Sequence, residues 1–162
     1  MVYRRMSIPE HPRVFISYAH RDGGGLAARL QSDLQALGFD AWFDKHRLVG
    51  GDVWAQKIEV AIDRCNVAVA LLSTGSFESD ICRAEQQRSL RRGKLVIPVR
   101  AQRDCDVPLP LETRQYIDFS EPANYPSAFR ELQASIRERR GIVAPRDIQQ
   151  PYNNSPALPN NL

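Results

Sequence analysis

Several segments carry residue types that could do chemistry, but the common patterns fail at a required position. Glycines 23–25 follow an apolar run, yet no Lys completes a phosphate-binding GxxxxGK(S/T) loop, and a dinucleotide GxGxxG fingerprint fails at its last position. The segment 74–78 lacks the second glycine of a GxSxG nucleophile elbow. Ser73 stands where a phosphoacceptor receiver domain would carry aspartate. These four chemistries are set aside.

The cysteines and histidines do not suggest a metal site or a disulfide framework. The three cysteines are odd in number, widely spaced and without a CxxC pair, which favours free thiols in a reducing cytosol. A structural zinc site needs four ligands at tight spacing. The candidate ligands are Cys65, Cys82, Cys105, His11, His20 and His46. They do not provide that spacing, so we expect no metal.

The elements that must position any site alternate between strand and helix patterns. Short apolar runs predict strands at 13–18, 40–43, 66–72, 95–99 and 116–119. Helical spacing predicts helices over 26–37, behind Asp52, over 79–92 and around 129–136. This alternation predicts an α/β, flavodoxin-like three-layer fold with a five-stranded parallel sheet and helices on both faces. Pro98 is awkward inside a central strand and predicts a bulge or a strand end.

Length and composition indicate one folded domain. A chain of 162 residues suits a single domain, and a net charge of +3 does not predict nucleic-acid binding. The longest apolar run, 67–72, is far shorter than the roughly 20 residues of a membrane-spanning helix. Pro and Asn become frequent after residue 140. We therefore expect an N-terminal extension at 1–12, a cytoplasmic folded domain at 13–140, and a disordered tail or linker at 141–162.

Parallel sheets of this kind bind ligands at the carboxyl ends of their strands, so functional residues should follow the predicted strands. The residues there resemble the TIR (Toll/interleukin-1 receptor) family over roughly 13–140. The pieces that carry the resemblance are 14–18 with its polar turn, Gly38 and Phe39 before 42–44, Leu48 with Gly51, Asp52 and Trp54, Ile58 with Ala61 and Ile62, 71–73 with Ser76, the set Ser79, Cys82 and Glu85, and finally 97–99. Their order along the chain makes the resemblance specific.

The resemblance implies two functional modes. Some TIR domains only recruit other TIR domains, whereas many bacterial and plant members cleave NAD at the nicotinamide–ribose bond with a glutamate that matches Glu85. One carboxylate suits this reaction, because nicotinamide leaves a cationic pyridinium as a neutral molecule and needs no acid. NAD is then a substrate, no cofactor is expected, and the product is ADP-ribose, a cyclic isomer or a base-exchange adduct. The leading hypothesis is an NAD nucleosidase of immune defence that is active after head-to-tail self-association.

The family pattern also implies binding residues. The substrate-binding candidates are Tyr18, Ala19, His20, Phe43, Ser73, Ser76 and Cys82. The loop that packs on a neighbouring TIR domain and helps complete its site matches Lys45, Arg47, Leu48, Gly50, Gly51 and Asp52. Other TIR domains and NAD are thus the expected partners, without nucleic acid or membrane.

Simpler interpretations stay open beside these. The alternative for Glu85 is a solvated helix residue that pairs with Arg88 or Ser89, and the family motif favours the catalytic interpretation over it. Residues 18–21, after the first predicted strand, could form a plain polar turn, and Phe43 could be a core aromatic. Ser73 and Ser76 could cap the segment that follows them. Trp54 lies on an apolar stripe, which favours core packing.

Basic side chains are frequent on the helix that carries Glu85. They are Arg83, Arg88, Arg91, Arg92 and Lys94. They either form a solvated face or attract NAD phosphates or an acidic partner surface.

One position departs from the family pattern. Many members have an aromatic residue just before the motif cysteine, and this chain has Ile81. If that aromatic stacks on substrate or on a neighbour, turnover here is weak or depends on assembly. The competing hypotheses are therefore a non-catalytic TIR interaction module and a nucleotide-sensing α/β domain without turnover.

Overall fold

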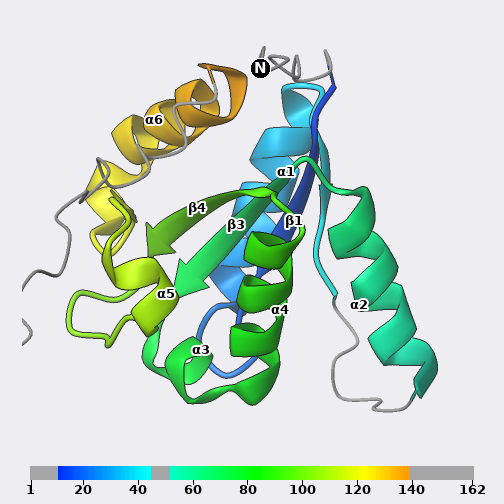
Figure 1. Ribbon diagram of the computed structural model, residues 1–162. Helices are drawn as coiled ribbons and strands as arrows, with labels where there is room; N and C mark the ends of the chain where they lie inside the picture. Colours follow the sequence, from blue (N-terminus) through cyan, green and yellow to red (C-terminus); the bar gives the residue numbers. More distant parts are fainter. Residues whose placement is uncertain (1–10, 45–51, 139–162) are drawn as a thin grey trace, which may run out of the picture.

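The structure, a computed structural model, describes residues 11–44 and 52–138 and is built on a five-stranded parallel sheet (Figure 1). The strands are β1 (Arg13–Ser17), β2 (Asp40–Trp42), β3 (Val67–Leu72), β4 (Leu95–Arg100) and β5 (Ile117–Asp118), in the order β2-β1-β3-β4-β5. All four neighbouring pairs are parallel. The predicted fold class is confirmed, and each of the five segments predicted as strands contains one.

Helices connect the strands and cover both faces of the sheet. The longer ones are α1 (Gly24–Ala36), α2 (Asp52–Arg64), α4 (Asp80–Arg91) and α6 (Tyr125–Glu138). Three short ones complete the set, namely α3 (Thr74–Glu78), α5 (Leu109–Glu112) and the 3-10 turn η1 (Pro122–Asn124). No described helix is long and apolar enough to cross a membrane.

The core consists of two apolar clusters, one on each face of the sheet, because strand side chains alternate between faces. On one face Val14 and Ile16 of β1 pack with the apolar sides of α1 and α6. On the other face Phe15 packs with α2 and with Leu90 of α4. Ser17 follows Phe15 at the period of two, so it lies on the face that α4 covers.

The prediction that Pro98 marks a bulge or a strand end is wrong, because Pro98 lies inside β4 and is in register with Ala70 of β3. The backbone N–H groups of Leu95 and Ala101 donate to carbonyls on the β3 side. Backbone N–H groups alternate in direction along a strand, so those of the even-numbered residues of β4 point toward β5. The ladder to β5 begins only at Val99. Proline therefore costs no hydrogen bond at this position.

Two further differences concern short helices. The segment after β3, expected as a turn, forms α3, and its N-terminus carries a capping box made by Ser73 and Ser76. The Pro-rich connection after β4 contains α5.

Gly38 ends the first helix region as expected, with a φ of 86° that favours glycine. The expected tail, 141–162, and residues 1–10 lie outside the described residues.

Candidate active site

Glu85 is a buried residue of α4, with only 3% of its surface exposed. Its Oε2 atom accepts a hydrogen bond of 2.6 Å from the hydroxyl of Ser17, the last residue of β1. The Ser89 hydroxyl donates to the backbone carbonyl of Glu85 at 2.8 Å. Burying a carboxylate is costly unless it is hydrogen-bonded, so this arrangement is a built feature of the sheet's carboxyl edge. The interpretation of Glu85 as a solvated surface residue is wrong.

A cavity of about 410 Å³, the strand-end pocket, lies at the carboxyl ends of β1 and β3, and Glu85 is not among the residues that line it. Ala19, His20 and Arg21 line it from the loop after β1, and Gly75 and Glu78 line it from α3. The pocket also touches Ser79 and Ile81, and Ile81 lies one helical turn before Glu85. An ion pair of 2.8 Å joins the exposed side chains of Arg21 and Glu78.

Tyr18 is a buried support for the loop after β1. Its hydroxyl donates to the backbone carbonyl of Asp44 at 2.6 Å and lies 3.2 Å from Nε2 of His20. Because the single hydroxyl proton goes to Asp44, the Nε2 atom of His20 is the donor in the second contact. Phe43 is buried and packs edge-on against the Tyr18 ring at 5.2 Å between centroids, which is a core position. Of the predicted binding residues, Ala19 and His20 line the pocket, whereas Tyr18 and Phe43 support it.

Ser73 and Ser76 are buried and act as caps. The Ser73 hydroxyl accepts from the Ser76 backbone N–H at 3.1 Å, and the Ser76 hydroxyl accepts from the Ser73 N–H at 2.9 Å. Ser73 also donates to a carboxylate oxygen of Asp22 at 2.7 Å. Cys82 is fully buried in α4, with its backbone N–H bound to the Ser79 hydroxyl, the N-cap of the helix. None of these three predicted binding side chains is among the residues that line the strand-end pocket.

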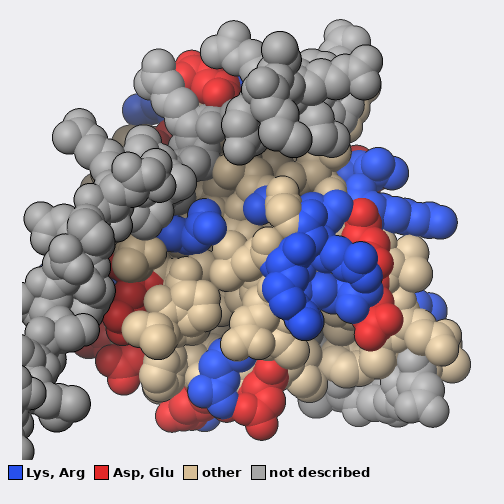
Figure 2. Space-filling model, viewed as in Figure 1, with Lys and Arg blue, Asp and Glu red and all other residues tan. Residues whose placement is uncertain are grey.

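The basic residues of α4 are largely directed at α2 rather than at Glu85. Arg88 and Arg92 make ion pairs with Asp63 of α2 at 2.9 and 3.2 Å, and the Lys94 amine donates to the Asp63 carbonyl. The hydrogen bond from Arg88 is the main reason that the pKa of Asp63 is lowered. Figure 2 shows blue side chains gathered over α4 with red ones beside them on the α2 side. The arrangement fits the interpretation of these arginines as a paired, solvated face.

Trp54 packs against the second core cluster, and its indole N–H donates to the carboxylate of Asp44. Core packing was the favoured interpretation of Trp54, and it is confirmed. The predicted interface residues Lys45, Arg47, Leu48, Gly50 and Gly51, together with the side chain of Asp52, lie outside the described residues. Within residues 11–44 and 52–138, no group of three or more His, Cys, Asp or Glu could hold a metal ion.

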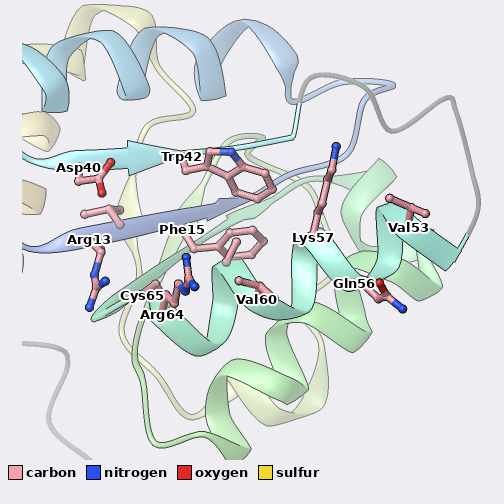
Figure 3. A pocket seen from close by; sticks show the side chains of 12 residues that line it. Arg13, Phe15, Asp40, Trp42, Val53, Gln56, Lys57, Val60, Arg64 and Cys65 are labelled. Atoms are coloured by element: carbon pink, nitrogen blue, oxygen red, sulfur yellow. The ribbon is translucent and has the colours of Figure 1, made fainter.

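A larger hollow of about 610 Å³, the α2 groove, lies between α2 and the β1–β2 edge of the sheet (Figure 3). Its floor includes Phe15 and Trp42, whose rings stack with centroids 5.7 Å apart. Arg13, Lys57 and Arg64 contribute cations to its lining. Glu85 is not among the residues that line the α2 groove.

Sequence reasoning missed two polar groups of the site. Ser17 was read only as part of an apolar strand, although a serine between buried apolar residues is a signal that a polar partner covers it. Asp22 was read as part of a turn, but its carboxylate binds groups from two distant loops. No local pattern could have indicated those partners, because they lie more than 50 residues away.

Comparison with known proteins agrees with the fold and with the order of the motifs. The family profile of the TIR domain matches residues 14–133. The chain belongs to the TIR family. A TIR domain structure from the Toll-related receptor TRR-2 of Hydra magnipapillata is 27% identical, with a TM-score of 0.64 over 76% of this chain and 97% of that one. The TIR domains of the activated Roq1 resistosome superpose with a TM-score of 0.50 at 19% identity, over 89% of this chain and 92% of that one, which supports the fold.

A curated relative of this TIR domain is an enzyme. The 2' cyclic ADP-D-ribose synthase AbTIR of Acinetobacter baumannii is 30% identical over 95 residues, which are 56% of this chain. The match spans 35% of that protein, so the chain covers about a third of its length. The structure of the CMP N-glycosidase BcmB of Clostridium botulinum shares the fold at 18% identity and a TM-score of 0.54, over 75% of this chain and 97% of that one.

Proposed function

We propose that this TIR domain cleaves NAD at the nicotinamide–ribose bond, with Glu85 as the catalytic carboxylate. The observation that carries the proposal is the buried Glu85 carboxylate, held by Ser17 at the carboxyl edge of the sheet, the edge at which the strand-end pocket also lies. The relationship to AbTIR supports the same reaction class. The products are ADP-ribose or a cyclic ADP-ribose, because either water or a substrate hydroxyl can attack the same cationic sugar.

The chemistry needs stabilisation of positive charge more than proton transfer. Departure of neutral nicotinamide leaves an oxocarbenium-like ribose, and a carboxylate in a water-poor site stabilises that charge more strongly than one in water. The Ser17 hydroxyl holds the Oε2 atom of this carboxylate in place. Glu85 acts as an electrostatic stabiliser and binds the ribose hydroxyls.

The strand-end pocket supports recognition of the anionic part of NAD. His20 and Arg21 line it, and the Arg21 guanidinium is a donor that binds a diphosphate well. Its volume of about 410 Å³ lies toward the small end of the range for ligand pockets. In this proposal a second TIR domain, packed head to tail, completes the site, and the domain acts in cytoplasmic immune defence.

The test is nicotinamide release from NAD by the full chain, followed by chromatography at high protein concentration and with a crowding agent. Glu85→Gln should lower kcat by at least about 100-fold, because the charge-stabilising group is lost while the shape is kept. Glu131→Gln, an exposed glutamate of α6, is the matched control and should be unchanged. Absence of nicotinamide release by assembled wild type contradicts the enzyme proposal, and full activity of Glu85→Gln contradicts the site.

A non-catalytic TIR interaction module is the second candidate, and Ile81 favours it. Ile81 lines the strand-end pocket and is 43% exposed, at the position where many family members carry an aromatic residue. An isoleucine offers no ring to stack on nicotinamide. Self-association without any nicotinamide release would favour this function over the enzyme.

A further inference from the structure

Asp22 joins three strand-end segments through its carboxylate. Its Oδ1 accepts from the Ser73 hydroxyl at 2.7 Å, and its Oδ2 accepts from the Gly75 backbone N–H at 2.7 Å and from the Gln102 amide at 3.3 Å. The donors follow β3 and β4, whereas Asp22 follows β1. One side chain thus connects the carboxyl ends of three adjacent strands. We call these four residues the Asp22 network.

The Asp22 network supplies hydrogen-bond acceptors to the first turn of α3. The Gln102 side-chain oxygen accepts from the Thr74 N–H at 2.9 Å, Asp22 from Gly75, and Ser73 from Ser76. A five-residue helix is not stable by itself, because nucleation is costly and its first N–H groups have no helical acceptors. The position of α3 therefore depends on Asp22 and Gln102.

The contact between Asp22 and Gly75 is too close for any side chain at position 75. A Cβ atom built there would lie 2.7 to 2.9 Å from the Asp22 carboxylate. Gly75 and Glu78 of α3 line one side of the strand-end pocket, and Ala19 to Arg21 line the other. Asp22 itself is not among the lining residues. With three donors on its two oxygens, Asp22 is suited to position these loops rather than to react.

We propose that Asp22 is a positioning residue that sets the separation of the two sides of the strand-end pocket and so determines its affinity for NAD. The catalytic consequence rests on the proposed function, whereas the structural link between Asp22 and Gly75 does not. The Asp22 carboxylate acts on the pocket through Gly75, because among its three hydrogen-bond donors Gly75 is the one that lines the pocket.

Asp22→Ala removes both acceptor oxygens, so the Ser73 hydroxyl and the Gly75 N–H both lose their partner. In the full chain, we expect KM for NAD to rise by about tenfold with kcat within about threefold, because binding geometry changes while Glu85 is intact. By NMR, the Gly75 N–H should exchange with solvent at least about tenfold faster than in wild type. Unchanged exchange at Gly75 would overturn the proposal.

A second arm uses the steric contact. In wild type, Gly75→Ala should lower the melting temperature and raise KM, because its methyl group meets the Asp22 carboxylate. In an Asp22→Ala background the same substitution should raise the melting temperature, because alanine favours helix and the clash is gone. Equal destabilisation in both backgrounds would overturn the link between the two residues.

Failure of the two proposals is distinguishable. If wild type releases no nicotinamide, the proposed function fails, while amide exchange and the sign of the Gly75→Ala effect still decide the role of Asp22. If Asp22→Ala does not fold, Gln102→Ala serves instead, since it removes the acceptor of the Thr74 N–H and leaves the carboxylate. Faster exchange confined to Thr74 and Gly75 supports the network, and unchanged exchange at both refutes it.

Discussion

The two hollows of this TIR domain differ in size and in what lies beside them. The α2 groove is the larger, about 610 Å³ against 410 Å³, and its floor is formed by stacked Phe15 and Trp42. The strand-end pocket is smaller, and its lining residue Ile81 lies one helical turn before the buried, hydrogen-bonded Glu85. A large apolar hollow would ordinarily be the default candidate site. The comparison teaches that a buried carboxylate at the strand ends is better evidence for chemistry than volume.

The largest expected effect concerns the thiol of Cys65, which lines the α2 groove. Burial raises the pKa of this thiol from 9.0 to about 11. At neutral pH its thiolate fraction is therefore about 100-fold lower than that of an ordinary cysteine, so Cys65 is a poor nucleophile. Alkylation by iodoacetamide, followed by mass spectrometry, should be far slower at Cys65 in the folded protein than in urea.

The same shift predicts a pH dependence of stability. Because the unfolded chain releases the thiol proton first, the free energy of unfolding should fall as the pH rises from 9.0 through about 11. Cys65→Ser should remove that part of the alkaline loss in urea titrations. Rapid alkylation of folded Cys65 at pH 7 would break the contrast between the two hollows.

Ser17→Ala tests what holds the carboxylate of the strand-end pocket. The substitution removes the 2.6 Å hydrogen bond to Glu85, and we expect kcat to fall by about tenfold while KM changes little. Ser32→Ala on the exposed side of α1 is the matched control. The nicotinamide-release assay measures both variants, and equal activity would show that Ser17 does not orient Glu85.

Glu78→Gln should make the pocket a better site for an anion. Glu78 pairs with Arg21 at 2.8 Å and competes with a diphosphate for it. Exposed ion pairs are weak, so KM for NAD should fall by at most about fivefold, and the effect should shrink at high salt. Arg21→Gln should move KM in the opposite direction. A KM that rises in Glu78→Gln would mean that Arg21 does not bind the substrate.

The smallest expected effect is in the α2 groove. Lys57→Glu reverses a charge of its lining. We expect kcat and KM to stay within about twofold of wild type, because Lys57 does not line the strand-end pocket and salt screens exposed charges. The same nicotinamide-release assay measures this variant beside Glu78→Gln. A larger change would show that the groove takes part in the reaction or in the assembly on which it depends.

The sheet could be predicted from sequence because its central strands β3 and β4 are buried, apolar runs. The run 66–72 corresponds to β3, and the helix expected over 79–92 is α4, with Ser79 and Arg92 as caps. The short helix α3 could not be predicted, because Thr, Gly and Ser favour turns and the groups that stabilise it come from distant loops. Non-local hydrogen bonds decide that segment.

Much of the candidate site was less accessible to sequence reasoning. The family resemblance identified Glu85, but its burial had no periodic signal, because the buried side of α4 is Cys82, Glu85, Gln86 and Ser89. An amphipathic pattern requires an apolar stripe, whereas the buried side of α4 is mostly polar. Ser17 and Asp22 became visible only when the loops were placed side by side.

The most direct measurement is NMR mapping of NAD on the Glu85→Gln protein, which keeps the substrate intact. The account predicts shifts in the backbone amides of Ala19, His20 and Gly75, with no change in the indole N–H of Trp42. Unchanged amides at the strand ends, together with a shifted Trp42 indole, would place NAD in the α2 groove and contradict the account.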